Sequence, residues 1–200
     1  MQRCGPMPQP LSHQPIRSDS PQLVLVGGGV RCGKSAFAIE RARRLGERRL
    51  FIATAEALDD EMSQRIAAHR RERGAEFDTI EEPLLLPEAL LDARADVVVV
   101  DCLTLWLSNL LMREPSEQVL ETRIGALVSA LCARRFHTIV VTNEVGMGLV
   151  PESALGRRFR DSAGQAHQRI AAISDEVYFG MLGSMLRLRP EPVCLQRLGA

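Results

Sequence analysis

The sequence predicts an α/β protein in which helices cover both faces of a mostly parallel sheet. Short apolar runs alternate along the chain with longer segments of helical periodicity, which is the pattern of repeated strand–helix–strand units. The strand runs are apolar at consecutive positions, as expected for strands buried on both faces. A length of 200 residues suits a single domain, which we assign to residues 21–200.

The individual strands are predicted from apolar runs that end at glycine or polar residues. Core strands are expected at 23–26, 50–53, 96–101 and 138–141, with further strands at 77–81 and 176–181 and a partner for the latter at 186–188. Helices are expected at 34–45, 59–74, 87–93, 103–112, 116–134 and 154–173. The helix at 59–74 opens with three acidic residues at the positive end of its dipole, and Gly74 closes it.

Composition narrows the classes of partner and compartment. Lys+Arg and Asp+Glu are equal at 25 residues each, so no net charge favours binding to nucleic acid or to a membrane surface. No apolar run reaches the ~18 residues that a spanning helix requires. The five cysteines are never in C-x-x-C spacing, which disfavours a zinc site and indicates the reducing cytoplasm. Residues 1–20 are rich in proline, glutamine and serine, and we expect a disordered tail there.

A phosphate-binding loop follows the first predicted strand. The spacing G-x-x-x-x-G-K-[ST] is met by Gly28, Gly29, Val30, Arg31, Cys32, Gly33, Lys34 and Ser35. Lys34 is the only lysine in the chain, at a position where a compact ammonium must enter a small backbone cradle. We expect backbone N–H groups and the following helix dipole to hold phosphates, Lys34 to bridge the terminal phosphates, and Ser35 to hold Mg²⁺. The loop predicts a protein that binds a nucleoside triphosphate.

Two further residues have both a functional and a structural interpretation. Asp101 ends a run of four valines, where it can help to hold Mg²⁺, cap the helix that begins at Leu103, or do both. A phosphate loop needs such a carboxylate, which favours the metal role. His69 shares a helical stripe with Met62 and Ile66, and arginines surround it in sequence. It is either a nucleophile kept neutral by those cations or a cation that the helix C-terminus favours, and spacing alone favours the second interpretation.

Several of these segments together resemble one family. They occur in the same order in the bifunctional adenosylcobinamide kinase/adenosylcobinamide-phosphate guanylyltransferases of cobalamin biosynthesis. The matching segments are residues 28–35, 52–54, 58–62, 65–66, 69–70, 79–83, 142–148 and 159–161. The resemblance covers about residues 22–180, and the stretch 142–148 is much more specific than the phosphate loop.

The resemblance implies a P-loop NTPase with a RecA-like sheet and two reactions. ATP or GTP phosphorylates adenosylcobinamide, and GTP then transfers GMP to adenosylcobinamide phosphate through a GMP-histidine intermediate. The matching histidine is His69, which reverses the preference from spacing. The resemblance also implies a homotrimer. Nucleotide contacts are expected at the loop 28–35 and at Ala55, Glu56, Ala57, Arg70, Arg71, Glu72, Arg73, Glu81 and Asp101.

Four positions depart from the usual residues of that family. Val30, Cys32, Phe77 and His167 stand where alanine, serine, tryptophan and asparagine are usual, and we expect Cys32, near a helix N-terminus and Lys34, to be reactive. The departures could weaken the kinase activity independently of guanylyl transfer. Two other functions fit the loop alone: a single-step small-molecule kinase, and a non-catalytic nucleotide switch or assembly ATPase.

Overall fold

Eight strands form one sheet in a computed structural model that describes residues 20–56, 74–114, 116–190 and 195–197. The sheet order is β3-β2-β4-β5-β1-β6-β7-β8. Pairing is parallel from β3 to β6, and β7 and β8 continue the sheet in antiparallel pairing. The strands are β1 (Leu23–Gly28), β2 (Arg49–Ala53), β3 (Asp78–Glu81), β4 (Val97–Asp101), β5 (His137–Val141), β6 (Glu176–Met181), β7 (Ser184–Arg189) and β8 (Leu195–Arg197).

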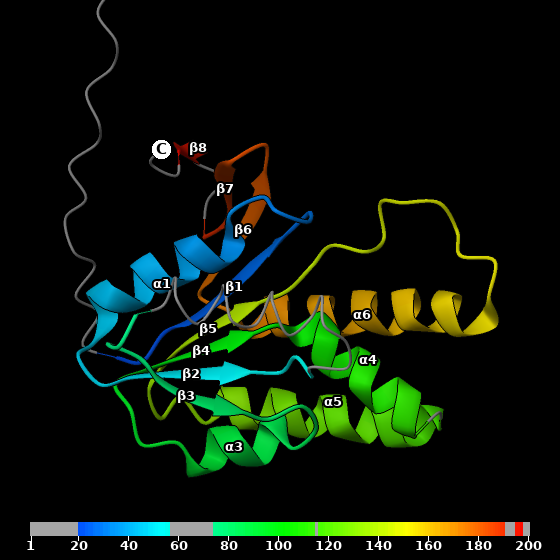
Figure 1. Cartoon of the computed structure of the whole chain (residues 1–200), viewed down its shortest axis with the longest axis horizontal. Coiled ribbons are helices and arrows are strands. Elements are labelled where there is room, and N and C mark those ends of the chain that lie inside the picture. The colour runs from blue at the N-terminus through cyan, green and yellow to red at the C-terminus, as the bar shows by residue number, and fades with distance from the viewer. Residues whose placement is uncertain (1–19, 57–73, 115, 191–194, 198–200) are drawn as a thin grey trace, which may run out of the picture.

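Helices lie on both faces of this sheet (Figure 1). α1 (Lys34–Leu45) packs on one face, where Phe37 and Ala38 join a core with Phe51 and Tyr178. The other face carries α3 (Leu86–Asp92), α4 (Leu103–Arg113), α5 (Glu117–Cys132) and α6 (Ala154–Ile173). Within the described residues, the fold class predicted from the sequence is confirmed.

The core of the α3–α6 face is built around the only tryptophan of the chain. Trp106 is fully buried, and its indole N–H donates to the carbonyl of Leu84 at 2.9 Å. This bond satisfies the one polar atom of the side chain. Since β4 is buried on both faces, Val97–Val100 are all fully buried, which explains the four consecutive valines in the sequence.

The predicted bounds of helices and strands agree closely with the structure where the sequence pattern lies within a few consecutive residues. The helix at 154–173 and the strand at 176–181 have the predicted bounds, and residues 184–189 pair with that strand as expected. The predicted helix at 116–134 is shorter, because Ser116 is its N-cap and accepts a hydrogen bond from the Val119 N–H. β8 was not predicted. The tail to residue 19 and residues 59–73 of the predicted helix 59–74 lie outside the described residues.

The parallel strands bring polar residues to one edge of the sheet. Thr54, Asp101 and Thr142 stand at or just beyond the carboxyl ends of β2, β4 and β5, and the glycine loop leaves the same end of β1. Carboxyl ends of parallel strands are where ligands bind in open α/β sheets. Among the described helices, none has the length and apolarity that crossing a membrane would require.

Candidate active site

The glycine loop is fixed against strand β6 by close backbone packing. Gly28 has φ +142°, and a Cβ atom there would lie 2.3 Å from the carbonyl oxygen of Gly180. Only glycine fits this conformation and this approach. Arg31 and Gly33 also have positive φ values, and the Gly33 carbonyl accepts the first helical bond from the Phe37 N–H. The loop thus turns directly into the N-terminus of α1.

Lys34 is held inside the loop that precedes it. The side chain is buried, and its ammonium donates to the Gly29 carbonyl at 2.5 Å and lies 3.6 Å from the Cys32 sulfur. The cation is therefore already positioned where the loop would hold phosphate oxygens. Its expected role in binding phosphates stays a prediction that this position supports.

Cys32 is buried at the base of the same loop, with 6% of its surface exposed. Its sulfur lies so close to strands β1 and β6 that a Cβ atom at Gly28 or Gly180 would approach it to 3.0 or 2.7 Å. Reactive cysteines are partly exposed to solvent, so this burial argues against the reactive thiol expected from the sequence. Cys32 fills space beneath the loop.

Ser35 and Asp101 come together from different elements. The Ser35 hydroxyl, in the first turn of α1, donates to Oδ2 of Asp101 at the end of β4 over 2.8 Å. The alternative role of Asp101 as a helix cap is wrong, because Cys102 occupies the N-cap position of α4. Mg²⁺ is bound by one or two carboxylates together with substrate phosphates. A hydroxyl and a carboxylate beside a phosphate loop fit that ion.

The segment after β2 is tied to α4. Asn109 donates to the Thr54 carbonyl at 2.8 Å, and Arg113 pairs with Glu56 at 2.6 Å. Ala55 lies between these two anchored residues. Sequence reasoning missed Asn109 and Arg113; they are four residues apart and therefore share one face of a helix, which was the available signal.

The remaining residues predicted to contact the nucleotide either lie farther along the carboxyl end of the sheet or fall outside the described residues. Glu81 ends β3 and is exposed, and three strands separate it from the strand that leads into the loop. His69, which carries the expected covalent chemistry, lies outside the described residues. So do Ala57, Arg70, Arg71, Glu72 and Arg73.

The specific stretch 142–148 begins between the phosphate loop and Asp101, because β5 lies between β1 and β4. The Asn143 amide donates to the Thr104 hydroxyl at 3.2 Å. The Glu144 N–H donates to the Gly28 carbonyl at 2.9 Å. Sequence reasoning used this stretch only for the resemblance, and its contacts show that it is part of the same site.

Two titratable groups beside this stretch are held neutral by their surroundings. Burial lowers the pKa of His167, whose Nε2 lies 2.7 Å from the Thr142 hydroxyl. Burial, reinforced by the charge of Asp101, raises the pKa of Cys102 to about 11. Neutral side chains here keep the number of charges near the phosphate loop small.

Residues 24–188 match the family of cobinamide kinase / cobinamide phosphate guanyltransferase. The chain belongs to this family. The resemblance found in the sequence is thereby confirmed.

Three bacterial relatives match this chain over nearly their own whole length. The bifunctional adenosylcobalamin biosynthesis protein CobP of Pseudomonas aeruginosa is 42% identical over 84% of this chain and 98% of its own. The CobU proteins of Escherichia coli and Salmonella typhimurium are 39% and 35% identical, each over 84% of this chain and 99% of theirs.

Solved structures with low sequence identity share the fold. The RadB recombinase superposes with a TM-score of 0.52 at 14% identity, covering 90% of this chain and 89% of its own. The flagellar accessory protein FlaH of Methanocaldococcus jannaschii gives 0.50 at 12% identity, covering 89% and 83%. At such identities the likeness concerns the fold alone, and it confirms the α/β fold with a mostly parallel sheet that the sequence predicts.

Proposed function

We propose that the chain catalyses two successive reactions. It phosphorylates adenosylcobinamide with ATP or GTP, and it then transfers GMP from GTP to the new phosphate to give adenosylcobinamide-GDP and pyrophosphate. The observation that carries the proposal is the gathering of Lys34, Ser35 and Asp101 at one sheet edge in a chain of this family. The bifunctional relatives that it matches over nearly their whole length support it.

The phosphate loop serves both reactions by gripping the triphosphate. Loop N–H groups and the N-terminus of α1 bind phosphate oxygens, and Lys34 neutralises charge on the terminal phosphates. The Ser35 hydroxyl and the Asp101 carboxylate would hold Mg²⁺, which when bound would offset the charge of the phosphate oxygens. Family likeness to nucleotide-using enzymes supports a divalent ion, and Mg²⁺ is our specific proposal.

The second reaction needs a nucleophile on the protein, and we assign it to His69. A neutral imidazole nitrogen attacks the α-phosphorus of GTP, the bond to the bridging oxygen breaks, and pyrophosphate leaves. An oxygen of adenosylcobinamide phosphate then attacks the same phosphorus, and the P–N bond breaks. Arg70, Arg71 and Arg73, which follow His69 in the sequence, would stabilise the charge that develops in each step.

The proposal includes a homo-oligomer, specifically a homotrimer, in the cytoplasm, where ATP and GTP are available. A run of apolar side chains on the segment between β5 and α6 supports association: Met147 is 80% exposed, Leu149 96% and Val150 62%. Exposed apolar patches mark interaction surfaces. Sedimentation of the wild type as a monomer at micromolar concentration would exclude this part of the proposal.

Product analysis tests the two reactions separately. With adenosylcobinamide and ATP, we expect adenosylcobinamide phosphate; on adding GTP, we expect adenosylcobinamide-GDP and pyrophosphate in equal amounts. A single-step kinase would stop at the phosphate, and a nucleotide switch would form neither product. Either of those results would refute the proposed pair of activities.

A further inference from the structure

The kinase reaction needs a group that takes the proton from the attacking hydroxyl. An alcohol is a poor nucleophile until it loses this proton, and a carboxylate within hydrogen-bonding reach is a common acceptor for it. Lys34 is a cation, and Asp101 is engaged with Ser35. We propose that Glu144 is the general base of the phosphoryl-transfer step, an assignment that rests on the proposed kinase function.

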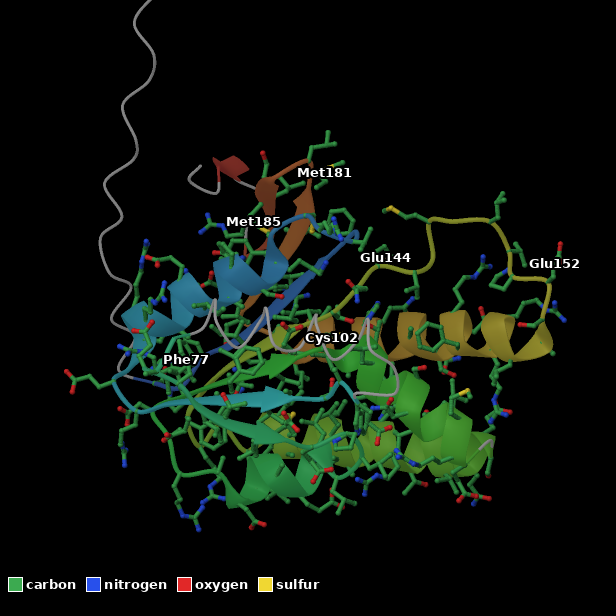
Figure 2. The ribbon with its side chains drawn as sticks, in the orientation of Figure 1. Phe77, Cys102, Glu144, Glu152, Met181 and Met185 are labelled. Atoms are coloured by element: carbon green, nitrogen blue, oxygen red, sulfur yellow. The ribbon has the colours of Figure 1, made fainter. Side chains whose placement is uncertain are left out.

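Topology places Glu144 beside the phosphate loop. β5 lies between β1, which leads into the phosphate loop, and β4, which ends at Asp101. Glu144 stands three residues beyond the end of β5, and its N–H is bonded to the Gly28 carbonyl at 2.9 Å. Figure 2 shows Glu144 at the carboxyl edge of the sheet, next to the loop that follows β1.

Among the described residues, the carboxylate of Glu144 is held in place by a backbone hydrogen bond and forms no ion pair. One oxygen, Oε1, accepts a hydrogen bond from the Gly146 N–H at 2.5 Å, which fixes the orientation of the side chain. Over the described part of the chain, no arginine, lysine or histidine forms an ion pair with it, whereas Glu56 is neutralised by Arg113. The side chain is half-buried, so one face stays open to a substrate.

An unneutralised carboxylate near a triphosphate weakens binding, because like charges repel through a partly buried site. This repulsion disappears during the reaction if the carboxylate accepts the proton of the attacking hydroxyl, because the side chain is then neutral. The acceptor hydroxyl then gains electron density as it attacks the terminal phosphate, and the carboxylate loses its charge at the moment when charge builds up on the phosphoryl group.

The step balances with the groups named. The hydroxyl oxygen of adenosylcobinamide forms a bond to the γ-phosphorus as the bond from that phosphorus to the β–γ bridging oxygen breaks. The hydroxyl proton passes to a Glu144 oxygen, and the nucleoside diphosphate leaves with the bridging electron pair. Solvent later takes the proton from Glu144. Guanylyl transfer uses a phosphate oxygen that is already ionised, so it has no need of this base.

The two half-reactions give a direct test with Glu144→Gln. Glutamine keeps an oxygen to accept the Gly146 N–H and removes the basicity. We expect kcat for phosphorylation of adenosylcobinamide to fall about 10²- to 10⁴-fold. KM for ATP should stay unchanged or fall, because the substitution removes a negative charge near the triphosphate. GMP transfer from GTP to supplied adenosylcobinamide phosphate should stay within about threefold of the wild-type rate.

Glu152→Gln is the matched control, because Glu152 is an exposed carboxylate at the far end of the same segment, before α6 (Figure 2). It should leave both rates unchanged. The assignment is overturned if Glu144→Gln keeps more than about a tenth of the phosphorylation rate, or if it reduces both half-reactions equally. Failure of the wild type to phosphorylate adenosylcobinamide would instead overturn the proposed function itself.

Discussion

Lys34 illustrates how one side chain can be dictated by the space around it. Its ammonium bonds to a carbonyl of its own loop and touches the Cys32 sulfur, and the side chain is almost completely buried. A guanidinium is planar and larger, and it cannot take three hydrogen-bonding directions from a single point. The cradle therefore selects lysine in a chain whose other basic residues are all arginine.

Both Lys34→Ala and Lys34→Arg should bind GTP more weakly than the wild type. Charge-assisted hydrogen bonds contribute about 1.5–3 kcal/mol each, so we expect at least a 10- to 100-fold rise in Kd, measured by calorimetry in Mg²⁺. The arginine variant separates shape from charge. Wild-type affinity in Lys34→Arg would show that charge alone matters and that the loop is less confined than described.

His167 couples the end of β5 to α6 in a way that depends on pH. Its pKa is lowered from 6.5 by burial, so the folded protein binds this proton less readily than the unfolded chain does. The free energy of unfolding should therefore fall as the pH drops through and below 6.5. His167→Asn, which keeps a polar partner for Thr142, should reduce this slope.

Denaturant unfolding between pH 5 and 8, followed through Trp106 fluorescence, measures that slope. His137 contributes a residual slope of the same sign, because burial and the charge of Arg41 lower its pKa as well. An identical pH dependence in His167→Asn and wild type would show that His167 titrates normally in the fold.

At the scale of elements, the approach of β1 to β6 sets the shape of the phosphate loop. Gly28→Ala would place a methyl group 2.3 Å from the Gly180 carbonyl in an unfavourable backbone conformation. We expect a loss of about 1–3 kcal/mol or more in the free energy of unfolding, together with loss of nucleotide binding.

Gly164→Ala is the contrasting substitution in α6. A Cβ atom at Gly164 would meet nothing within 4 Å, so alanine should stabilise the helix by about 0.5–1 kcal/mol. Thermal unfolding of both variants checks the pair. Equal stability changes in the two would mean that the loop has room for a side chain at position 28.

Elements with a local sequence pattern could be predicted from the sequence, whereas contacts between distant residues could not. The phosphate loop and the strand 97–101 were predictable because their signals lie within a few consecutive residues. The pairing of Ser35 with Asp101 was foreseen only as two possible ligands of one ion. The contacts of Arg113 with Glu56 and of Glu144 with Gly28 join residues far apart in sequence. No local pattern encodes such pairs, because they depend on sheet order.

At the scale of the whole molecule, we propose one triphosphate site that serves two different nucleophiles. In the proposed function, the hydroxyl of adenosylcobinamide would attack the terminal phosphorus, whereas His69 would attack the α-phosphorus. The loop can grip the triphosphate in both cases, so the identity of the nucleophile decides which bond breaks. The proposed capacity of His69 to carry GMP would therefore distinguish this chain from a simple kinase.

Incubation with GTP labelled at its α-phosphate tests that capacity most directly. We predict that the protein acquires a covalent label that survives denaturation and is released by acid but not by base. When adenosylcobinamide phosphate is added, the label should pass to that compound. His69→Ala should take no label, and His137→Gln, altered at the opposite edge of the sheet, should label like wild type. A wild-type protein that acquires no label, although it binds GTP, would contradict the account.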